Sequence, residues 1–281
     1  MTTTLRAVWT FARLELAEAL RSKWLLLAAS IYFGLMAAFV WLGLRESSVL
    51  GFTGLSRVLL NLSNAVVVVF PLVVLLATHS AIVRARTSGF FELMLAQPVK
   101  RSTWFWGLLV SRLLVLVGPL AVIMVGCAVA AAFVEPEPEL PLVALRSVLI
   151  TAALVFAFLG LGLYFSSRAK SVERALVYAL VAFVVSAVLH DVLLIAVLLR
   201  TSLPPQVVFL LSALNPAELA RVGLLSSVDP ELAALGPVGF WLANTLGPTL
   251  ALVLAVGWPA AVGTVATWRA AANLAKADLV G

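Results

Sequence analysis

The residues of this 281-residue chain that could do chemistry are few and scattered. The metal-ligating types are His79, His190, Cys127, Met1, Met36, Met94 and Met124. A copper or zinc site needs several such ligands on facing elements, and their spacing here predicts no ligand set. The GxxxxGK[ST] phosphate loop and the HExxH, CxxC and GxSxG motifs are also missing from the sequence. We therefore expect no catalytic residue, no metal and no cofactor bound by this chain, which is not expected to be an enzyme by itself.

One ionisable pair, His190 and Asp191, lies well inside an apolar run. Ionisable side chains are costly in lipid and mark functional positions by default. Counted from residue 172, where the run begins, Asp191 falls in its far half. Two interpretations stay open: a structural pair that reaches the interface or a partner helix, and a pair that takes part in transport or gating.

The elements that position these groups must be membrane helices. Hydrophobic residues make up 63% of the chain and charged residues 11%, whereas a soluble domain has about 25% charge. The net charge of +6 could suggest nucleic acid. The bases, however, lie in short segments beside apolar runs, as the positive-inside rule describes. We expect membrane lipid and no nucleic acid as the surroundings of this chain.

A helix that crosses the hydrocarbon needs about 20 apolar residues. Six runs meet this requirement, at 25–44, 58–83, 103–134, 147–167, 172–199 and 239–268. A shorter run at 203–214 is expected to be re-entrant, interfacial or a buried cap. The sequence therefore predicts an all-α integral membrane protein with a transmembrane domain over 25–268 and a tail over 269–281.

Six spans place both termini on one side of the membrane. Fourteen of the 19 bases then fall on the side of the termini and five on the other. This asymmetry predicts cytoplasmic termini and a multi-pass protein of the cytoplasmic (inner) membrane.

Two segments outside the spans carry helix signals. Residues 1–24 contain an amphipathic helix, which is either an interfacial anchor or a connector that touches a cytoplasmic partner. The outer segment 200–238 contains a strong helix start, with Asn215 as N-cap, Pro216 at the first position and Glu218 three residues after the cap. We expect a short surface helix there, whose residues Asn215, Pro216, Glu218 and Arg221 could dock an outer partner.

The stretch SGFFELMLAQPVKRSTWFWG, residues 88–107, separates the second and third spans. It resembles the cytoplasmic loop of ABC-2-type permeases, which reads roughly G-T-L-E-x-L-L-x-x-P-x-x-R. The matching residues are Gly89, Glu92, Leu93, Leu95, Pro98 and Arg101. The resemblance implies the type V exporter-like permease fold and a coupling helix at 88–97 that docks on an ATPase subunit.

The composition of this stretch suits rigid-body coupling. A glycine gives a permissive hinge on one side, a proline ends the helix on the other, and apolar side chains between them give a docking face. The expected coupling residues are Gly89, Phe90, Phe91, Glu92, Leu93, Met94, Leu95, Pro98, Lys100 and Arg101. One departure is the pair Arg84 and Arg86, which stands where related loops carry acids, so we expect the partner groove to differ.

Further stretches make the resemblance more specific, to one group within the ABC-2 permeases. RSKWLLLA at 21–28, LGFTGLSRVLLNLSN at 50–64 and LNPAELARVGLLS at 214–226, with Asp191, resemble the ABC-2 permeases that serve maturation of the copper centres of nitrous oxide reductase. The resemblance implies a homodimer, a NosF-like ATPase dimer that holds ATP and Mg, a NosD-like periplasmic β-helical protein and a visiting NosL-like copper lipoprotein. Two alternatives stay open: an ABC-2 exporter of a lipid, drug or polysaccharide, and a scaffold that relays ATPase motion without transport.

Overall fold

The computed structural model describes residues 2–21, 30, 34, 69–91, 100–134, 140–201, 203–228, 232, 236–245 and 247–276. Secondary structure within these ranges is helical, with no strand. The predicted first span at 25–44, the first part of the second span at 58–68 and most of the predicted coupling helix lie outside the described residues.

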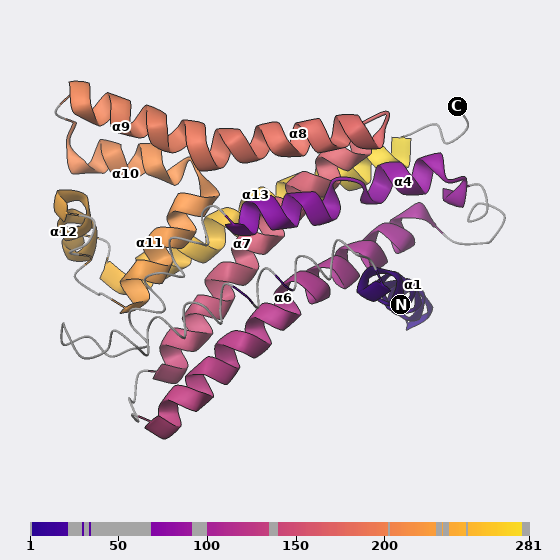
Figure 1. The fold of residues 1–281 in the computed structure, drawn as a ribbon, viewed down its shortest axis with the longest axis horizontal. Coiled ribbons are helices and arrows are strands. Elements are labelled where there is room, and N and C mark those ends of the chain that lie inside the picture. The colour runs from indigo at the N-terminus through magenta and orange to yellow at the C-terminus, as the bar shows by residue number, and fades with distance from the viewer. Residues whose placement is uncertain are drawn as a thin grey trace.

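Long helices that run side by side form the body of the molecule (Figure 1). Their bounds are α1 Thr2–Arg21, α4 Ala81–Thr87, α6 Arg101–Val134, α7 Leu140–Arg168, α8 Val172–Val184, the π-helical turn η1 Val185–Leu189, α9 His190–Arg200, α10 Pro205–Ala213, α11 Pro216–Val228, α12 Gly236–Thr245 and α13 Gly247–Lys276. Residues 69–78 are also helical and lead into α4.

Five helices of the described chain are long and apolar enough to cross a membrane, at Val69–Thr87, Arg101–Gly126, Pro141–Arg168, Val172–Arg200 and Thr249–Lys276. The pair α10 and α11 passes the same test as a sixth span, but it is bent by 118°. The chain is therefore a multi-pass membrane protein whose described part is helical. The bend places the 203–214 run in a broken or re-entrant hairpin, which was one of the three expected alternatives.

The last span differs from the expected run at 239–268. The chain breaks between α12 and α13 at Gly247, whose φ of +68° lies in the left-handed region that favours glycine. Pro248 follows at the start of α13, where its missing N–H costs nothing. The span therefore begins near Thr249 and continues to Lys276.

Glycine lets the central helices α7 and α13 approach each other closely. A Cβ added to Gly160 of α7 would lie 2.7 Å from the carbonyl oxygen of Gly263 in α13, and one added to Gly263 would lie 2.8 Å from the carbonyl oxygen of Phe156. Helices in lipid gain no hydrophobic stabilisation from association, so close packing at small residues holds them together. Gly223 of α11 meets Ala255 of α13 in the same way.

The N-terminal helix α1 packs along the first turns of α6. A Cβ on Gly107 of α6 would lie 2.7 Å from Cβ of Phe11, and Ala12 is buried at this contact. The amphipathic segment is thus docked on the protein, which agrees with a connector helix more closely than with a free interfacial anchor.

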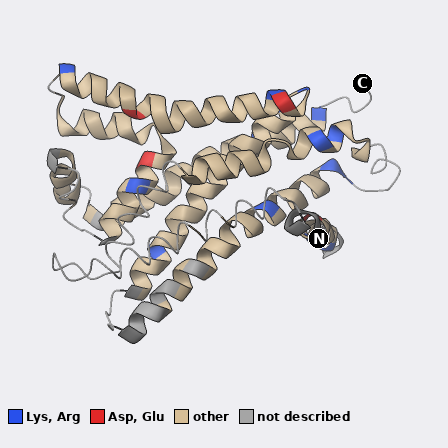
Figure 2. Cartoon of the chain, in the orientation of Figure 1, with Lys and Arg blue, Asp and Glu red and all other residues tan. Residues whose placement is uncertain are grey.

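Several helix ends meet on one side of the bundle, at the right-hand end of Figure 1: α4, the first turn of α6, the last turn of α7 and the last turn of α13. Basic residues gather there (Figure 2). We call this side the basic end. The hairpin of α10 and α11 and the helix α12 lie toward the opposite end.

Substitution of Gly263 by Ala is expected to destabilise the protein by about 1–3 kcal/mol, because the new methyl group meets backbone of α7 that cannot move aside. Gly257→Ala is the matched control, since it lies in the same helix and a Cβ there has nothing within 4 Å. Thermal unfolding in detergent measures both. Equal midpoints for the two variants would show that the helices do not depend on this contact.

Candidate functional site

The coupling segment predicted at 88–97 is described at its two flanks. Gly89 has a φ of +72°, so the chain turns there in a conformation that glycine adopts readily. Lys100 and Arg101 are described on the other flank. The predicted coupling residues Glu92, Leu93, Met94, Leu95 and Pro98 lie outside the described residues.

Phe90, Phe91 and Trp104 form an aromatic cluster at the base of this segment. The ring centroids of Phe91 and Trp104 are 5.0 Å apart in an edge-to-face arrangement, and those of Phe90 and Trp104 are 5.7 Å apart. Phe91 is only 1% exposed. Phe91 packs on the chain's own α6, because an aromatic ring gains more from a fully covered pocket than from a half-exposed face; its contact with an ATPase stays a prediction.

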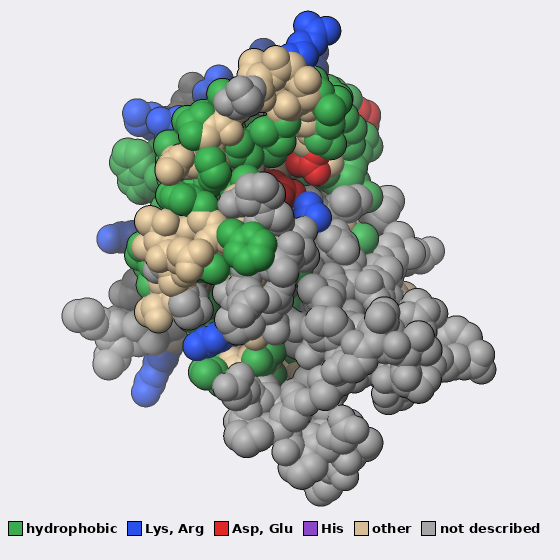
Figure 3. All heavy atoms as spheres, turned by 90° about the vertical axis from the view of Figure 1, so that its left-hand side faces the viewer, with side chains coloured by type: hydrophobic (Ala, Val, Ile, Leu, Met, Phe, Trp, Pro, Cys, Tyr) green, Lys and Arg blue, Asp and Glu red, His purple; other side chains and the backbone are tan. Residues whose placement is uncertain are grey.

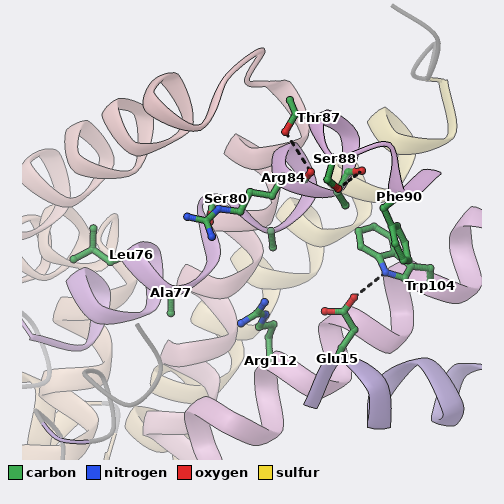
Figure 4. A pocket seen from close by; sticks show the side chains of 12 residues that line it. Glu15, Leu76, Ala77, Ser80, Arg84, Thr87, Ser88, Phe90, Trp104 and Arg112 are labelled. Atoms are coloured by element: carbon green, nitrogen blue, oxygen red, sulfur yellow. Dashed lines mark hydrogen bonds between the residues drawn. The ribbon is translucent and has the colours of Figure 1, made fainter. Parts of the chain in front are cut away.

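Trp104 also connects the segment to α1. Its Nε1–H donates a hydrogen bond of 2.9 Å to Oε1 of Glu15 (Figure 4). The start of the coupling segment, the first turn of α6 and α1 are thus joined by aromatic packing and one charge-assisted hydrogen bond.

Arg86 contacts the last turn of α7. Its guanidinium donates to the carbonyl oxygens of Ser167 at 3.0 Å and Ala169 at 3.5 Å. The last carbonyls of a helix lack intrahelical partners and carry partial negative charge, so a cation is stabilised there. Arg86 therefore stabilises the fold of this chain itself, whereas Arg84 is exposed.

Ser166 of α7 supports the beginning of α4. The helix that starts at Val69 breaks at His79 and Ser80, and α4 begins anew at Ala81. The backbone N–H groups of Ile82 and Val83 both donate to Oγ of Ser166, at 2.9 and 3.1 Å. A buried hydroxyl on a neighbouring helix thus supplies the acceptor that these amides need.

The other flank of the segment is bonded to α13. Arg101 donates to the carbonyl oxygen of Leu274 at 3.4 Å, and Nδ2 of Asn273 donates to Oγ of Ser167 at 3.0 Å. We call the bonds of Ser166, Arg86, Asn273 and Arg101 the basic-end network. It ties both flanks of the coupling segment to α7 and α13.

A second set of polar residues lies nearer the opposite end, where α11 begins. Oδ1 of Asn215 accepts from the N–H of Ala217 at 3.0 Å, as expected of an N-cap. The same side chain donates through Nδ2 to the carbonyl oxygen of Ser186 at 2.6 Å. Ser186 belongs to η1, where the hydrogen-bond register of the helix changes.

His190 of α9 makes a hydrogen bond to the neighbouring helix α10. Its Nε2 lies 3.0 Å from the carbonyl oxygen of Leu211 in α10, so the nitrogen must carry the proton and donate. Its Nδ1 lies 3.4 Å from Oδ1 of Asp191. The structure thus brings together the His190–Asp191 pair and the start of α11, which the sequence treats as separate sites.

The helix α11 differs from the expected surface helix. Asn215 is 4% exposed and Glu218 is 9% exposed, and Leu219, Ala220, Val222, Leu224 and Leu225 are buried on several sides of the helix. The helix is more deeply buried than the expected surface helix, because Gly223 and the alanines let α7 and α13 cover it. Among the polar residues named for outer docking, only the half-buried Arg221 keeps appreciable exposure.

Glu218 and Arg221 pair within this polar set, with Nη1 of Arg221 3.6 Å from Oε2 of Glu218. Oε1 of Glu218 is buried and has no hydrogen-bond partner in the part of the chain that the structure describes. Seen end-on, acidic and basic side chains adjoin among hydrophobic ones on this face (Figure 3). The described residues include no group of three His, Cys, Asp or Glu side chains that could hold a metal ion.

Sequence reasoning missed Ser166, Ser186 and Asn273. Serines inside an apolar helix normally bond to their own helix, so nothing in the sequence marks Ser166 as an acceptor for another one. Asn273 falls in the expected tail over 269–281, beyond the last apolar run, so the sequence pattern gives no signal for its bond.

Comparison with known proteins assigns the class. Residues 9–272 match the family described as ABC-2 family transporter protein. The chain belongs to this family and is a permease subunit of an ABC transporter, as its sequence predicted. Membership in this class implies an ATPase partner on another chain.

Two relatives refine the likeness. A Pseudomonas aeruginosa protein described as probable ABC transporter permease protein NosY is 31% identical over 265 residues, which cover 89% of this chain and 96% of that protein. A Stutzerimonas stutzeri protein of the same description is 30% identical over 258 residues, with 89% and 91% covered. The predicted likeness to this kind of ABC-2 permease is confirmed.

Ser166→Ala is expected to loosen α4, because the N–H groups of Ile82 and Val83 lose their acceptor at about 1–3 kcal/mol per buried group. Hydrogen–deuterium exchange of the α4 amides should rise. Ser147→Ala is the control, since Oγ of Ser147 is buried in the same helix without a partner in the described residues. Similar exchange in both variants would contradict the role given to Ser166.

Asn215→Ala is expected to cost about 1–2 kcal/mol, because the N-cap of α11 and the partner of the Ser186 carbonyl are lost together. Thermal unfolding reports the cost, and exchange at the first turn of α11 reports its location. Asn244→Ala provides the comparison, since its exposed side chain bonds only within its own helix. A loss of stability no larger than that of Asn244→Ala would contradict the role given to the Asn215 side chain, which joins α11 to η1.

Proposed function

We propose that this chain forms a homodimeric permease of the inner membrane with both termini in the cytoplasm. The gathering of basic side chains at the basic end supports this orientation by the positive-inside rule (Figure 2). The helix Val172–Arg200 supports a second copy, because only 6% of its apolar window is buried within one chain. In this proposal the run at 25–44 is the first span, which makes six together with the five long apolar helices of the described chain.

The segment 88–101 couples the permease to a NosF-like ATPase dimer, which holds ATP and Mg. The observation that carries this assignment is the anchoring of both flanks of the segment. Arg86 ties the α4 side to α7, and Arg101 ties the α6 side to α13. Because both flanks are hydrogen-bonded to membrane helices, displacement of the segment by the ATPase moves several spans together. A free loop would change its own shape without moving them.

The motion serves a periplasmic partner in the maturation of the copper centres of nitrous oxide reductase. Support comes from the two relatives described as NosY permeases and from the sequence resemblance at 50–64 and 214–226. The partners in this proposal are a NosD-like β-helical protein outside the membrane and, at times, a NosL-like copper lipoprotein. The chain itself conveys motion and leaves ATP hydrolysis to its partner.

Gly89→Ala tests the coupling. The substitution places a Cβ on a left-handed backbone, which costs about 1–2 kcal/mol, and the turn that begins the segment must change. ATP turnover of the reconstituted complex, measured as stimulation of the ATPase by the permease, should fall about tenfold, the change in rate that ~1.4 kcal/mol produces.

Gly247→Ala is the matched control, because Gly247 has a similar φ of +68° but begins α13 far along the chain from the coupling segment. Both variants should assemble with the ATPase on purification. Normal stimulation in Gly89→Ala, or equal loss in both variants, would refute the assignment of the segment.

A further inference from the structure

A cavity of about 530 Å³ opens beside the coupling segment, between the helix Val69–Thr87, α1 and α6 (Figure 4). Its walls carry two guanidinium groups, those of Arg84 and Arg112, together with several hydroxyl groups and an aromatic and aliphatic portion. None of the functions assigned to the coupling segment uses this space.

The charge on the walls is mainly positive. The Arg84 guanidinium makes no hydrogen bond or ion pair with the residues that the structure describes, although it lines the cavity. Arg112 adds a second positive charge. The one lining carboxylate, Glu15, already accepts the Trp104 hydrogen bond through Oε1. An anion in this cavity would therefore meet a net attraction.

The hydroxyl groups differ in availability. Those of Thr87 and Ser88 donate to carbonyl oxygens of α4. The hydroxyl of Ser80 has no hydrogen bond within the described part of the chain. Ser80 lies four residues before Arg84, so both side chains are on one face of this helical segment. A planar guanidinium and a hydroxyl that line one cavity are a good match for phosphate oxygens.

The cavity also has an apolar part. Leu76 and Ala77 line it about one turn from Ser80, on the side away from Arg84, and Trp104 and Phe90 line it as well. The wall formed by the helix Val69–Thr87 thus changes from apolar at Leu76 to basic at Arg84. An occupant that carries both a phosphate and a hydrocarbon chain satisfies both parts, whereas inorganic phosphate satisfies only one.

We propose that this cavity binds an anionic membrane phospholipid, with its phosphate between Arg84 and Ser80 and its acyl chain along Leu76 and Ala77. Basic pockets between membrane helices are known to hold anionic headgroups. The assignment of this lipid to the cytoplasmic leaflet rests on the proposed orientation of the chain. The lipid site itself does not depend on coupling to an ATPase.

The test uses the full chain in nanodiscs of phosphatidylcholine with a minor fraction of phosphatidylglycerol. Native mass spectrometry counts the phosphatidylglycerol that stays on the protein when the disc is removed. We expect selective retention by the unmodified chain and a loss of about fivefold in Arg84→Gln, the effect of one basic residue at an anionic surface. Ser80→Ala should show a smaller loss.

Arg174→Gln is the control, because Arg174 is exposed at the start of α8 and does not line the cavity. Equal retention by Arg84→Gln and the unmodified chain would overturn the proposal, as would equal losses in Arg84→Gln and Arg174→Gln. Thermal stabilisation by inorganic phosphate in discs of phosphatidylcholine alone, abolished by Arg84→Gln, would overturn the lipid in favour of free phosphate. No ATPase is present in this experiment, so its result does not depend on the outcome of the Gly89→Ala coupling test.

Discussion

The close approach of backbone at Gly160 and Gly263 is the contact on which the rest of this structure depends. In a bilayer the apolar side chains of α7 and α13 are already solvated by lipid, so their burial against each other stabilises little. What holds the two helices together is dispersion between atoms that only glycine lets come so near. The other described elements, with the exception of α9, pack directly or through one neighbour on this pair.

Several of the hydrogen bonds between helices form where helical regularity fails. The break at His79 and Ser80 is matched by Ser166, the register change of η1 is matched by Asn215, and the last turn of α10 is bonded by His190. An unsatisfied backbone group in hydrocarbon costs several kcal/mol, so each irregularity requires its particular partner. The irregular positions are therefore also the positions at which one helix is fixed to another.

Much of the architecture follows from the sequence, because hydrocarbon thickness dictates the length of apolar runs. The run at 172–199 and the helix Val172–Arg200 share nearly the same bounds, and Asn215 is the N-cap that its sequence context indicates. A capping signal, however, says where a helix starts and not what covers it, so the burial of α11 escaped prediction. The aromatic contact of Phe91 and the bonds of Ser166 escaped it because they join residues many positions apart in the chain.

The two polar sets stand near opposite ends of the bundle, and α13 connects them. It is 30 residues long, or about 45 Å of helix. Near its end, Asn273 and Leu274 belong to the basic-end network; toward its start, Ala255 packs on Gly223 of α11, whose N-cap holds the π-helical turn η1. A stiff helix moves at both ends when one end is displaced, and packed glycine contacts slide in discrete steps because they cannot stretch. Displacement of the segment after Gly89 would therefore reach the Asn215–Ser186 bond through the Arg101–Leu274 hydrogen bond, the helix α13 and its contact with α11.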